Sequence, residues 1–117
     1  MCIRDSAGLE YLLAKGIPFS AVACANDEMA AGALDAARKR GLEIPGDLSI
    51  IGFDNVFLTR YTHPKLSSVD CNLAEMGRMA ARCALRDTYG RQDLDITNSY
   101  QPSVALRESI APVNGSG

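Results

Sequence analysis

The order of apolar and polar positions along the chain predicts helices and strands that alternate. Leucines recur at helical spacing within residues 7–15, and a glycine and a proline then end the pattern. The short apolar run at residues 19–25 predicts a buried strand. From residue 27 to residue 40 apolar residues recur at steps of three and four, which predicts a helix that ends at Gly41.

The same pattern continues through the rest of the chain. Residues 48–53 are apolar almost throughout, which predicts a second strand that is covered on both faces. Asn72 and Glu75 have the spacing of a capping box, so we expect a helix to begin there. The other segments expected are an irregular stretch at 54–64, a short strand at 66–70, the body of the helix to 89, a polar connection at 90–99, a strand at 103–109 and a loose tail at 114–117.

This order of elements predicts an α/β fold. Strands that alternate with helices indicate a doubly wound, parallel sheet with flanking helices. Three or four strands make only a partial sheet of this kind, and no strand precedes residue 7. We therefore expect the chain to be a fragment of a longer protein. Its opening letters, MCIRDS, are similar to translated adaptor sequence, so residues 1–6 are expected to be a non-native leader.

Composition narrows the class of protein. Apolar residues make up 47% of the chain, which excludes a disordered polymer, and a net charge of −2 argues against a surface that seeks nucleic acid. The basic cluster at 38–40 suits the end of a helix. No segment is long and apolar enough to span a membrane, so no membrane partner is expected.

Cysteine and histidine are arranged without metal-ligand spacing. The four cysteines form no C-x-x-C pair, and His63 has no cysteine or histidine beside it in sequence. We expect no metal site and no cofactor. Reduced thiols are the default for a cytosolic protein.

Polar residues follow two predicted strands directly, where each strand ends. Asn26 and Asp27 follow the first strand, and Asp54 follows the second. In open parallel sheets, ligands bind beyond the carboxyl ends of the strands. If the two strands are neighbours, these side chains share a rim that can bind the hydroxyls or ring nitrogens of a sugar or base-like molecule. For Asn26 and Asp27, capping of the following helix is an alternative to ligand contact, and the two roles are about equally expected. No helix is predicted after Asp54, so capping explains that residue less well.

The residues also match a family pattern. From about residue 7 to residue 110, the chain resembles the C-terminal half of the effector-binding core of the LacI/GalR family of bacterial transcriptional regulators. The stretches that carry the resemblance are ACANDEMAAGALDAARKRGLEIPGDLSIIGFDNV, HPKLSSVD, GRMAARCAL and PSVALRES. The family fold is the periplasmic-binding-protein-like type I, in which two α/β lobes enclose a sugar-sized cleft. The resemblance implies that residues 7–71 are part of the C-terminal lobe, that 72–89 form a crossover helix of the other lobe, and that 90–117 return and end the chain.

The resemblance also implies roles for individual residues. Asn26 and Asp27 stand where the family places polar effector contacts, and Asp54 matches its cleft aspartate. Cys71 stands near a crossover position where some relatives use a longer polar side chain. For the side-by-side homodimer of the family, the interface elements are the helix at 27–40 and the segment at 56–63. The interface candidates are Arg38, Phe57 and Tyr61.

Three functions remain to be compared. The first is a cytoplasmic, effector-responsive regulator that contacts operator DNA only through an N-terminal helix-turn-helix that this chain lacks. The second is a sugar-binding protein of an ABC transport system, but the unpaired cysteines and the stretch IPGDLSIIGFD favour the regulator. An enzyme is not expected, because the sequence has no Ser-His-Asp order, no glycine-rich phosphate loop and no metal cluster.

Overall fold

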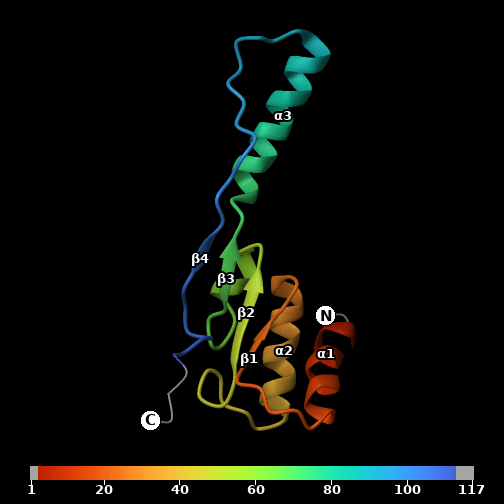
Figure 1. Cartoon of the computed structure of the whole chain (residues 1–117), viewed down its shortest axis with the longest axis vertical. Helices are drawn as coiled ribbons and strands as arrows, with labels where there is room; N and C mark the ends of the chain where they lie inside the picture. The colour runs from red at the N-terminus through yellow and green to blue at the C-terminus, as the bar shows by residue number, and fades with distance from the viewer. Residues whose placement is uncertain (1–2, 113–117) are drawn as a thin grey trace.

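The computed structural model describes residues 3–112 as a small α/β unit from which one helix projects (Figure 1). The helices are α1 (Ile3–Ala14), α2 (Asp27–Lys39) and α3 (Leu73–Tyr89), with a short 3₁₀ helix, η1, at Phe57–Arg60. The strands are β1 (Ala21–Ala23), β2 (Ser49–Phe53), β3 (Ser67–Asp70) and β4 (Ser103–Ala105). The element order therefore matches the predicted one, and the strands are shorter than the apolar runs suggested.

The sheet has the order β1-β2-β3-β4. β1, β2 and β3 are parallel, and Ala23 lies beside Ile51 in the register of β1 and β2. This confirms that the two strands followed by polar residues are neighbours. β4 is antiparallel to β3, with Asp70 beside Ser103, so the prediction of a parallel final strand was wrong. The reason is that α3 lies beyond the end of β3 rather than across the sheet, and the chain returns along β3 in the opposite direction (Figure 1).

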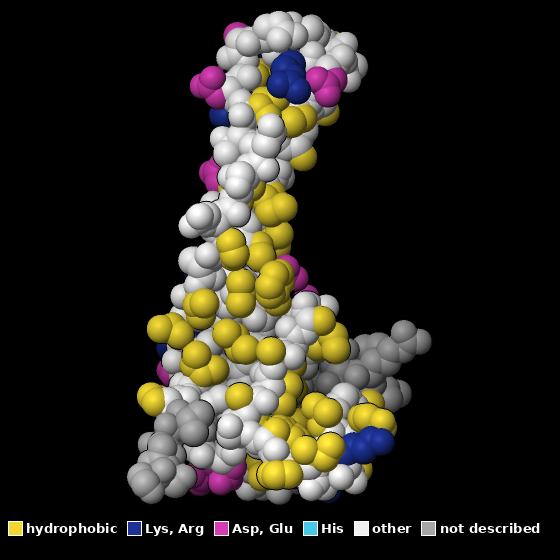
Figure 2. All heavy atoms as spheres, viewed as in Figure 1, with side chains coloured by type: hydrophobic (Ala, Val, Ile, Leu, Met, Phe, Trp, Pro, Cys, Tyr) yellow, Lys and Arg dark blue, Asp and Glu magenta, His cyan; other side chains and the backbone are white. Residues whose placement is uncertain are grey.

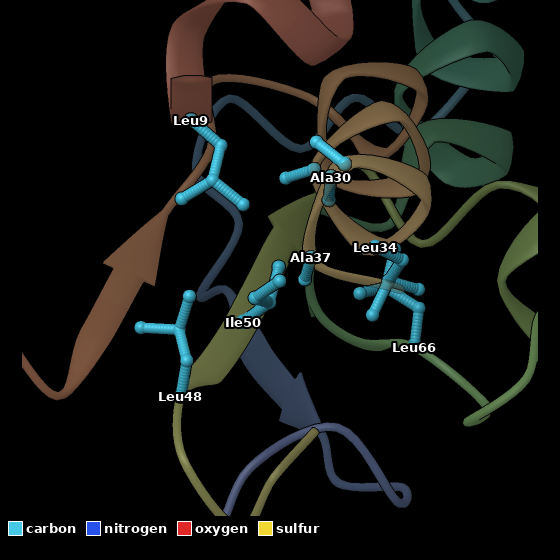
Figure 3. Close-up of a cluster of buried hydrophobic side chains, with 9 residues drawn as sticks. Leu9, Ala30, Leu34, Ala37, Leu48, Ile50 and Leu66 are labelled. Atoms are coloured by element: carbon cyan, nitrogen blue, oxygen red, sulfur yellow. The ribbon is translucent and has the colours of Figure 1, made fainter. Parts of the chain in front are cut away.

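The core lies between the sheet and the two N-terminal helices. Ile50 and Leu66 have no exposed surface and lie against the alanine-rich face of α2, while Leu9 of α1 closes the cluster (Figure 3). Burial alternates along β2: Ile50 and Gly52 are buried, Ile51 is half-buried and Phe53 is exposed. Within residues 3–112 one face of β2 is therefore covered, and not both faces as its apolar run predicted.

The ends of α2 follow the predicted chemistry. The Asn26 Oδ1 accepts a hydrogen bond from Met29 N at 2.8 Å, which caps the first turn. At the other end Gly41 adopts a φ of +71°, and the amides of Gly41 and Leu42 donate to the carbonyls of Arg38 and Ala37. This is the Schellman arrangement, which needs a residue that tolerates the left-handed conformation.

The capping box predicted at the start of α3 is not formed. Asn72 is left-handed, with a φ of 57°, and its side chain makes no capping hydrogen bond. The Glu75 carboxylate pairs with Arg78 instead of reaching back to the first turn. Asn72 N donates to Asp70 Oδ1 at 2.7 Å, so Asp70 fixes the entry to the helix.

The helix α3 and the segment that returns from it extend away from the sheet (Figure 1). The radius of gyration is 18.3 Å, whereas a compact chain of this length would have about 13 Å. Leu73 and Met76 remain 45% and 44% exposed, and Met79 is the buried residue of α3. Hydrophobic side chains are visible along this projecting part in Figure 2.

The two ends of the chain bear on two predictions. The helix α1 begins at Ile3, four residues before the predicted start, and residues 1–2 lie outside the described range. That residues 1–6 are a non-native leader stays a prediction. The tail predicted to be loose, 114–117, also lies outside the described residues.

Candidate functional site

The carboxyl ends of β1 and β2 place Asn26 and Asp54 at the same edge of the sheet. Both residues are partly exposed. Asn26 uses its Oδ1 to cap α2, while its Nδ2 donates no hydrogen bond within residues 3–112. The Asp54 carboxylate makes no hydrogen bond or ion pair in the same described range, although its backbone N donates to Val69 O at 2.9 Å. The same edge of the sheet therefore carries a carboxylate and an amide nitrogen that have no hydrogen-bond partner within residues 3–112.

The chain turns at the end of β2 through two left-handed residues. Asp54 has a φ of 97° and Asn55 a φ of 53°. Residues other than glycine rarely adopt such angles, although Asp and Asn tolerate them better than most. Backbone conformations of this kind cluster at functional sites, where surrounding contacts hold them in place.

Asp27 lies beneath the rim. Its side chain has no exposed surface. Its Oδ2 accepts a hydrogen bond from Val56 N at 2.7 Å, and its Oδ1 accepts one from Ser68 Oγ at 2.6 Å. The carboxylate also lies in the first turn of α2, where a negative charge is favourable. Asp27 therefore joins α2 to the segment after β2 and to β3, and it does not face a solute as the sequence predicted.

Asn55 joins the rim to the end of β3 and to the segment that follows β4. Its Nδ2 donates to Asp70 Oδ2 at 2.9 Å, and its Oδ1 accepts from Arg107 Nη2 at 2.6 Å. Arg107 also donates through Nη1 to Leu66 O at 2.7 Å. Sequence reasoning missed Asn55, Asp70 and Arg107 as site residues. The available signal was a basic residue directly after the three apolar residues at 104–106.

Hydrogen bonds and nearby cations lower the pKa of Asp70. The largest effect comes from the Asn72 amide, followed by the Asn55 side chain, and the positive charges of Arg107 and Arg60 act in the same direction. The carboxylate is therefore held in its ionised, hydrogen-bond-accepting form. This form is the one that can accept from both Asn55 and Asn72.

Cys71 occupies a different position from the rim residues. It is half-buried at the start of α3 and lines a cavity of about 310 Å³ with Met76, Asn98, Tyr100 and Pro102. No interaction within residues 3–112 joins Cys71 to Asn26 or Asp54. Its contact with an effector stays a prediction.

The three interface candidates are all exposed to solvent. Phe57 and Tyr61 are 73% and 65% exposed, and their ring centroids lie 4.7 Å apart. The aromatic rings thus pack on each other and still face solvent. Arg38 is exposed and pairs with Asp35 at 2.7 Å. A cavity of about 260 Å³ between α2 and the segment after η1 is lined by Ala31, Leu34, Asp35, Arg38, Thr62 and His63.

The described residues offer little other chemistry. Residues 3–112 contain no group of histidine, cysteine and acidic side chains that could hold a metal ion. Cys24, Cys71 and Cys83 are free thiols, and burial raises the pKa of Cys24. In the part of the chain that the structure describes, no helix has the length and apolar character needed to cross a membrane.

Comparison with known proteins identifies clear relatives. Residues 4–110 match the model of the periplasmic binding protein-like domain. The chain is 41% identical over 100 residues to the HTH-type transcriptional regulator GalR of Escherichia coli K12, covering 86% of this chain and 29% of that protein. It is 40% identical over 107 residues to GalS of Salmonella typhimurium LT2, covering 92% of this chain and 31% of that protein.

Solved structures are also similar to this chain. A sugar-binding transcriptional regulator of the LacI family from Escherichia coli, complexed with phosphate, superposes with a TM-score of 0.81 at 36% identity. The match covers 92% of this chain and 39% of that one. The chain thus spans about a third of the length of the curated relatives it matches.

Proposed function

The chain belongs to the LacI/GalR family of transcriptional regulators, as part of the periplasmic-binding-protein-like effector-binding region, and from this premise we propose that its rim binds a sugar or related polyol. The observation that carries the proposal is the Asp54 carboxylate. It is partly exposed at the end of β2 and has no partner within residues 3–112. Sugar hydroxyls donate strong hydrogen bonds to such a carboxylate.

The rim residues divide into two roles in this proposal. Asp54 accepts hydrogen bonds from effector hydroxyls, and the Nδ2 of Asn26 donates one, because both groups are free and lie at neighbouring strand ends. Asp27 supports the rim from below, since its two oxygens are already bonded to Val56 N and Ser68 Oγ. Cys71 lies at the start of α3, so its contact with the effector would be made from that side of the rim.

In the intact protein the effector acts through a balance between lobe arrangements. A ligand that binds one arrangement more tightly shifts the population toward it. The intact protein is a cytoplasmic homodimer that binds operator DNA through a separate N-terminal domain. The exposed surface with Arg38, Phe57 and Tyr61 supports its side-by-side contact. The matched relatives are named as transcriptional regulators, which favours this role over sugar transport.

A ligand screen on the intact regulator tests the proposal. Melting temperature is measured with D-galactose, D-ribose, cellobiose, D-sorbitol and, as an apolar control, cyclohexanol. A specific ligand stabilises the folded state by mass action, so one sugar or polyol is expected to raise the melting temperature in a concentration-dependent way. The same compound is expected to change operator affinity. A panel without any shift, or a shift with cyclohexanol alone, would count against the sugar rim.

A further inference from the structure

Asn55 lies next to Asp54, and Arg107 binds Asn55. Neither residue is one of the groups proposed to contact the effector. We propose that they are positioning residues: together with Asp70 they form a clasp that ties the Asp54 turn to the end of β3 and to the segment that follows β4. This inference rests on the proposed function, because it concerns the orientation of the proposed effector contact. The clasp is defined as Asn55, Asp70 and Arg107.

The clasp uses both ends of a single amide. Asp70 ends β3, where the chain leaves for α3, and it accepts from Asn55 Nδ2. Arg107 lies two residues after the end of β4, and it donates to Asn55 Oδ1. An asparagine can satisfy both neighbours because its amide carries a donor and an acceptor. A carboxylate at position 55 would keep Arg107 and repel Asp70.

Arg107 binds the segment after β4 to the start of β3. Arg107 Nη1 donates to Leu66 O at 2.7 Å, and Arg107 N donates to Ser67 Oγ at 2.8 Å. Its Nη2 reaches Asn55, two residues beyond the end of β2. A planar guanidinium with several donors can hold two acceptors that come from different segments, one before β3 and one after β2.

Asp54 depends on this support because its own carboxylate has no partner within residues 3–112. Its direction is set by the backbone of residues 54–56. The three amides of this turn donate to Val69 O, Ser68 Oγ and Asp27 Oδ2 in that order. The Asn55 side chain adds links to Asp70 at the end of β3 and to Arg107 after β4. A shift of the segment after β4 relative to β3 therefore changes the Asp54 turn, and effector bound at Asp54 biases the end of β3, from which the chain enters α3.

Exchanging the side chains at positions 55 and 70, singly and together, tests the clasp. Asn55→Asp places two carboxylates against each other, and Asp70→Asn places two amide NH₂ groups against each other. In the double variant, which combines Asn55→Asp with Asp70→Asn, the amide introduced at position 70 can donate to the carboxylate introduced at position 55. The new amide can still accept from Asn72 N, and the new carboxylate can accept from Arg107. The two single variants are expected to break the clasp, and the double variant to restore it.

The measurement is hydrogen–deuterium exchange of the ligand-free intact regulator, followed by mass spectrometry. Each single variant is expected to speed exchange of amides 54–56 about tenfold, and the double variant to return it to near the wild-type rate. Amides in the middle of α2 serve as the internal control and should keep their rates. Arg107→Lys, which keeps the charge but not the planar group, is expected to act like the single variants.

Three results would overturn the clasp: unchanged exchange at 54–56 in the single variants, no rescue in the double variant, or equal acceleration in α2. The last would mean that Asn55 supports only global stability. Because no ligand is used, a negative result leaves the proposed sugar site untouched. A failed sugar screen likewise leaves this test valid.

Discussion

Asp54 differs from the other two acidic residues near the rim in the state of its carboxylate. Asp27 is buried and bonded through both oxygens, and Asp70 accepts from Asn55 and Asn72. Asp54 accepts nothing within residues 3–112 and is partly exposed. A carboxylate that is held in position without internal partners retains its full capacity to accept hydrogen bonds from a solute.

Removal of the Asp54 carboxylate should weaken effector binding selectively. Loss of a charge-assisted hydrogen bond costs about 1.5–3 kcal/mol, so Asp54→Ala is expected to lower affinity roughly tenfold to a hundredfold. The ligand-free melting temperature should fall only by the added backbone strain, because no internal hydrogen bond is lost but alanine tolerates the φ of 97° less well than aspartate. Isothermal titration of the intact regulator measures the affinity, with the sugar that gives the largest thermal shift.

Asp54→Asn is the matched control for this prediction. It keeps the shape and one acceptor oxygen and removes the charge, so its affinity should fall between those of the wild type and Asp54→Ala. Full affinity in Asp54→Ala would contradict the role assigned to this residue.

At the scale of single residues, the sequence predicted that Asn26 and Asp54 lie at the same edge of the sheet. It did not predict the hydrogen bonds that hold the turn after β2. Asn26 and Asp54 could be placed together because strand ends are visible in the apolar pattern. Asp27 could not be recognised as buried, because its burial depends on Ser68 and Val56, which come from other elements. Arg107 reaches Asn55 from 52 positions away along the chain. Local patterns carry no information on such pairs.

β2 and α2 approach each other closely at Gly52. A Cβ added at Gly52 would lie 2.1 Å from Asp27 Oδ1 and 3.2 Å from Asp27 Cα. Both atoms belong to the first turn of α2, and Asp27 is fixed there by two hydrogen bonds. Glycine at position 52 therefore allows the carboxylate to lie directly on the strand.

Gly52→Ala is expected to destabilise the fold. Insertion of a methyl group into a packed interior costs about 1–3 kcal/mol, and here the methyl group also displaces a bonded carboxylate. Urea unfolding of the 117-residue chain, followed by circular dichroism at low protein concentration, measures the change in the free energy of unfolding.

Gly77→Ala provides the matched comparison. An added Cβ at Gly77 meets no atom within 4 Å, and the residue lies inside α3. Alanine is favoured over glycine in a helix by about 0.5–1 kcal/mol, so this variant should be neutral or more stable. Wild-type stability in Gly52→Ala would show that α2 and β2 can separate without cost, contrary to this argument.

At the scale of elements, periodicity predicted which segments fold and not where they lie. The pattern of the last strand was detected, yet its direction was not, because alternation of apolar residues is the same in either direction. The spacing of Asn72 and Glu75 suggested a cap. Asp70 overrides it by binding Asn72 N and holding Asn72 in a left-handed conformation. That α3 belongs to a second lobe stays a prediction from the resemblance.

At the scale of the whole molecule, the chain has a packed unit and a projecting part with different surfaces. The principal extents are 57 × 36 × 25 Å. Leu73, Met76 and Leu85 of α3 are 45%, 44% and 44% exposed. Apolar side chains line this projecting part in Figure 2. Contiguous exposed apolar surface of this kind promotes association.

The isolated 117-residue chain is therefore expected to self-associate through α3. Size-exclusion chromatography with light scattering should show soluble species larger than a dimer. The double variant Leu73→Glu with Leu85→Glu should reduce them to dimer or monomer, because added acidic residues increase solubility and the net charge is already −2. A glutamate at position 73 also suits the first turn of the helix.

A second variant separates this association from the proposed dimer contact. Phe57→Glu with Tyr61→Glu adds the same charge to the exposed aromatic pair, which lies on the surface shared by α2 and η1. If α3 drives the association, this variant keeps the large species, and combination with the α3 substitutions yields monomer. A wild-type chain that is monomeric at the same concentration would mean that the exposed apolar residues of α3 do not drive association. Loss of the large species in the aromatic variant alone would assign association to the surface around η1 instead.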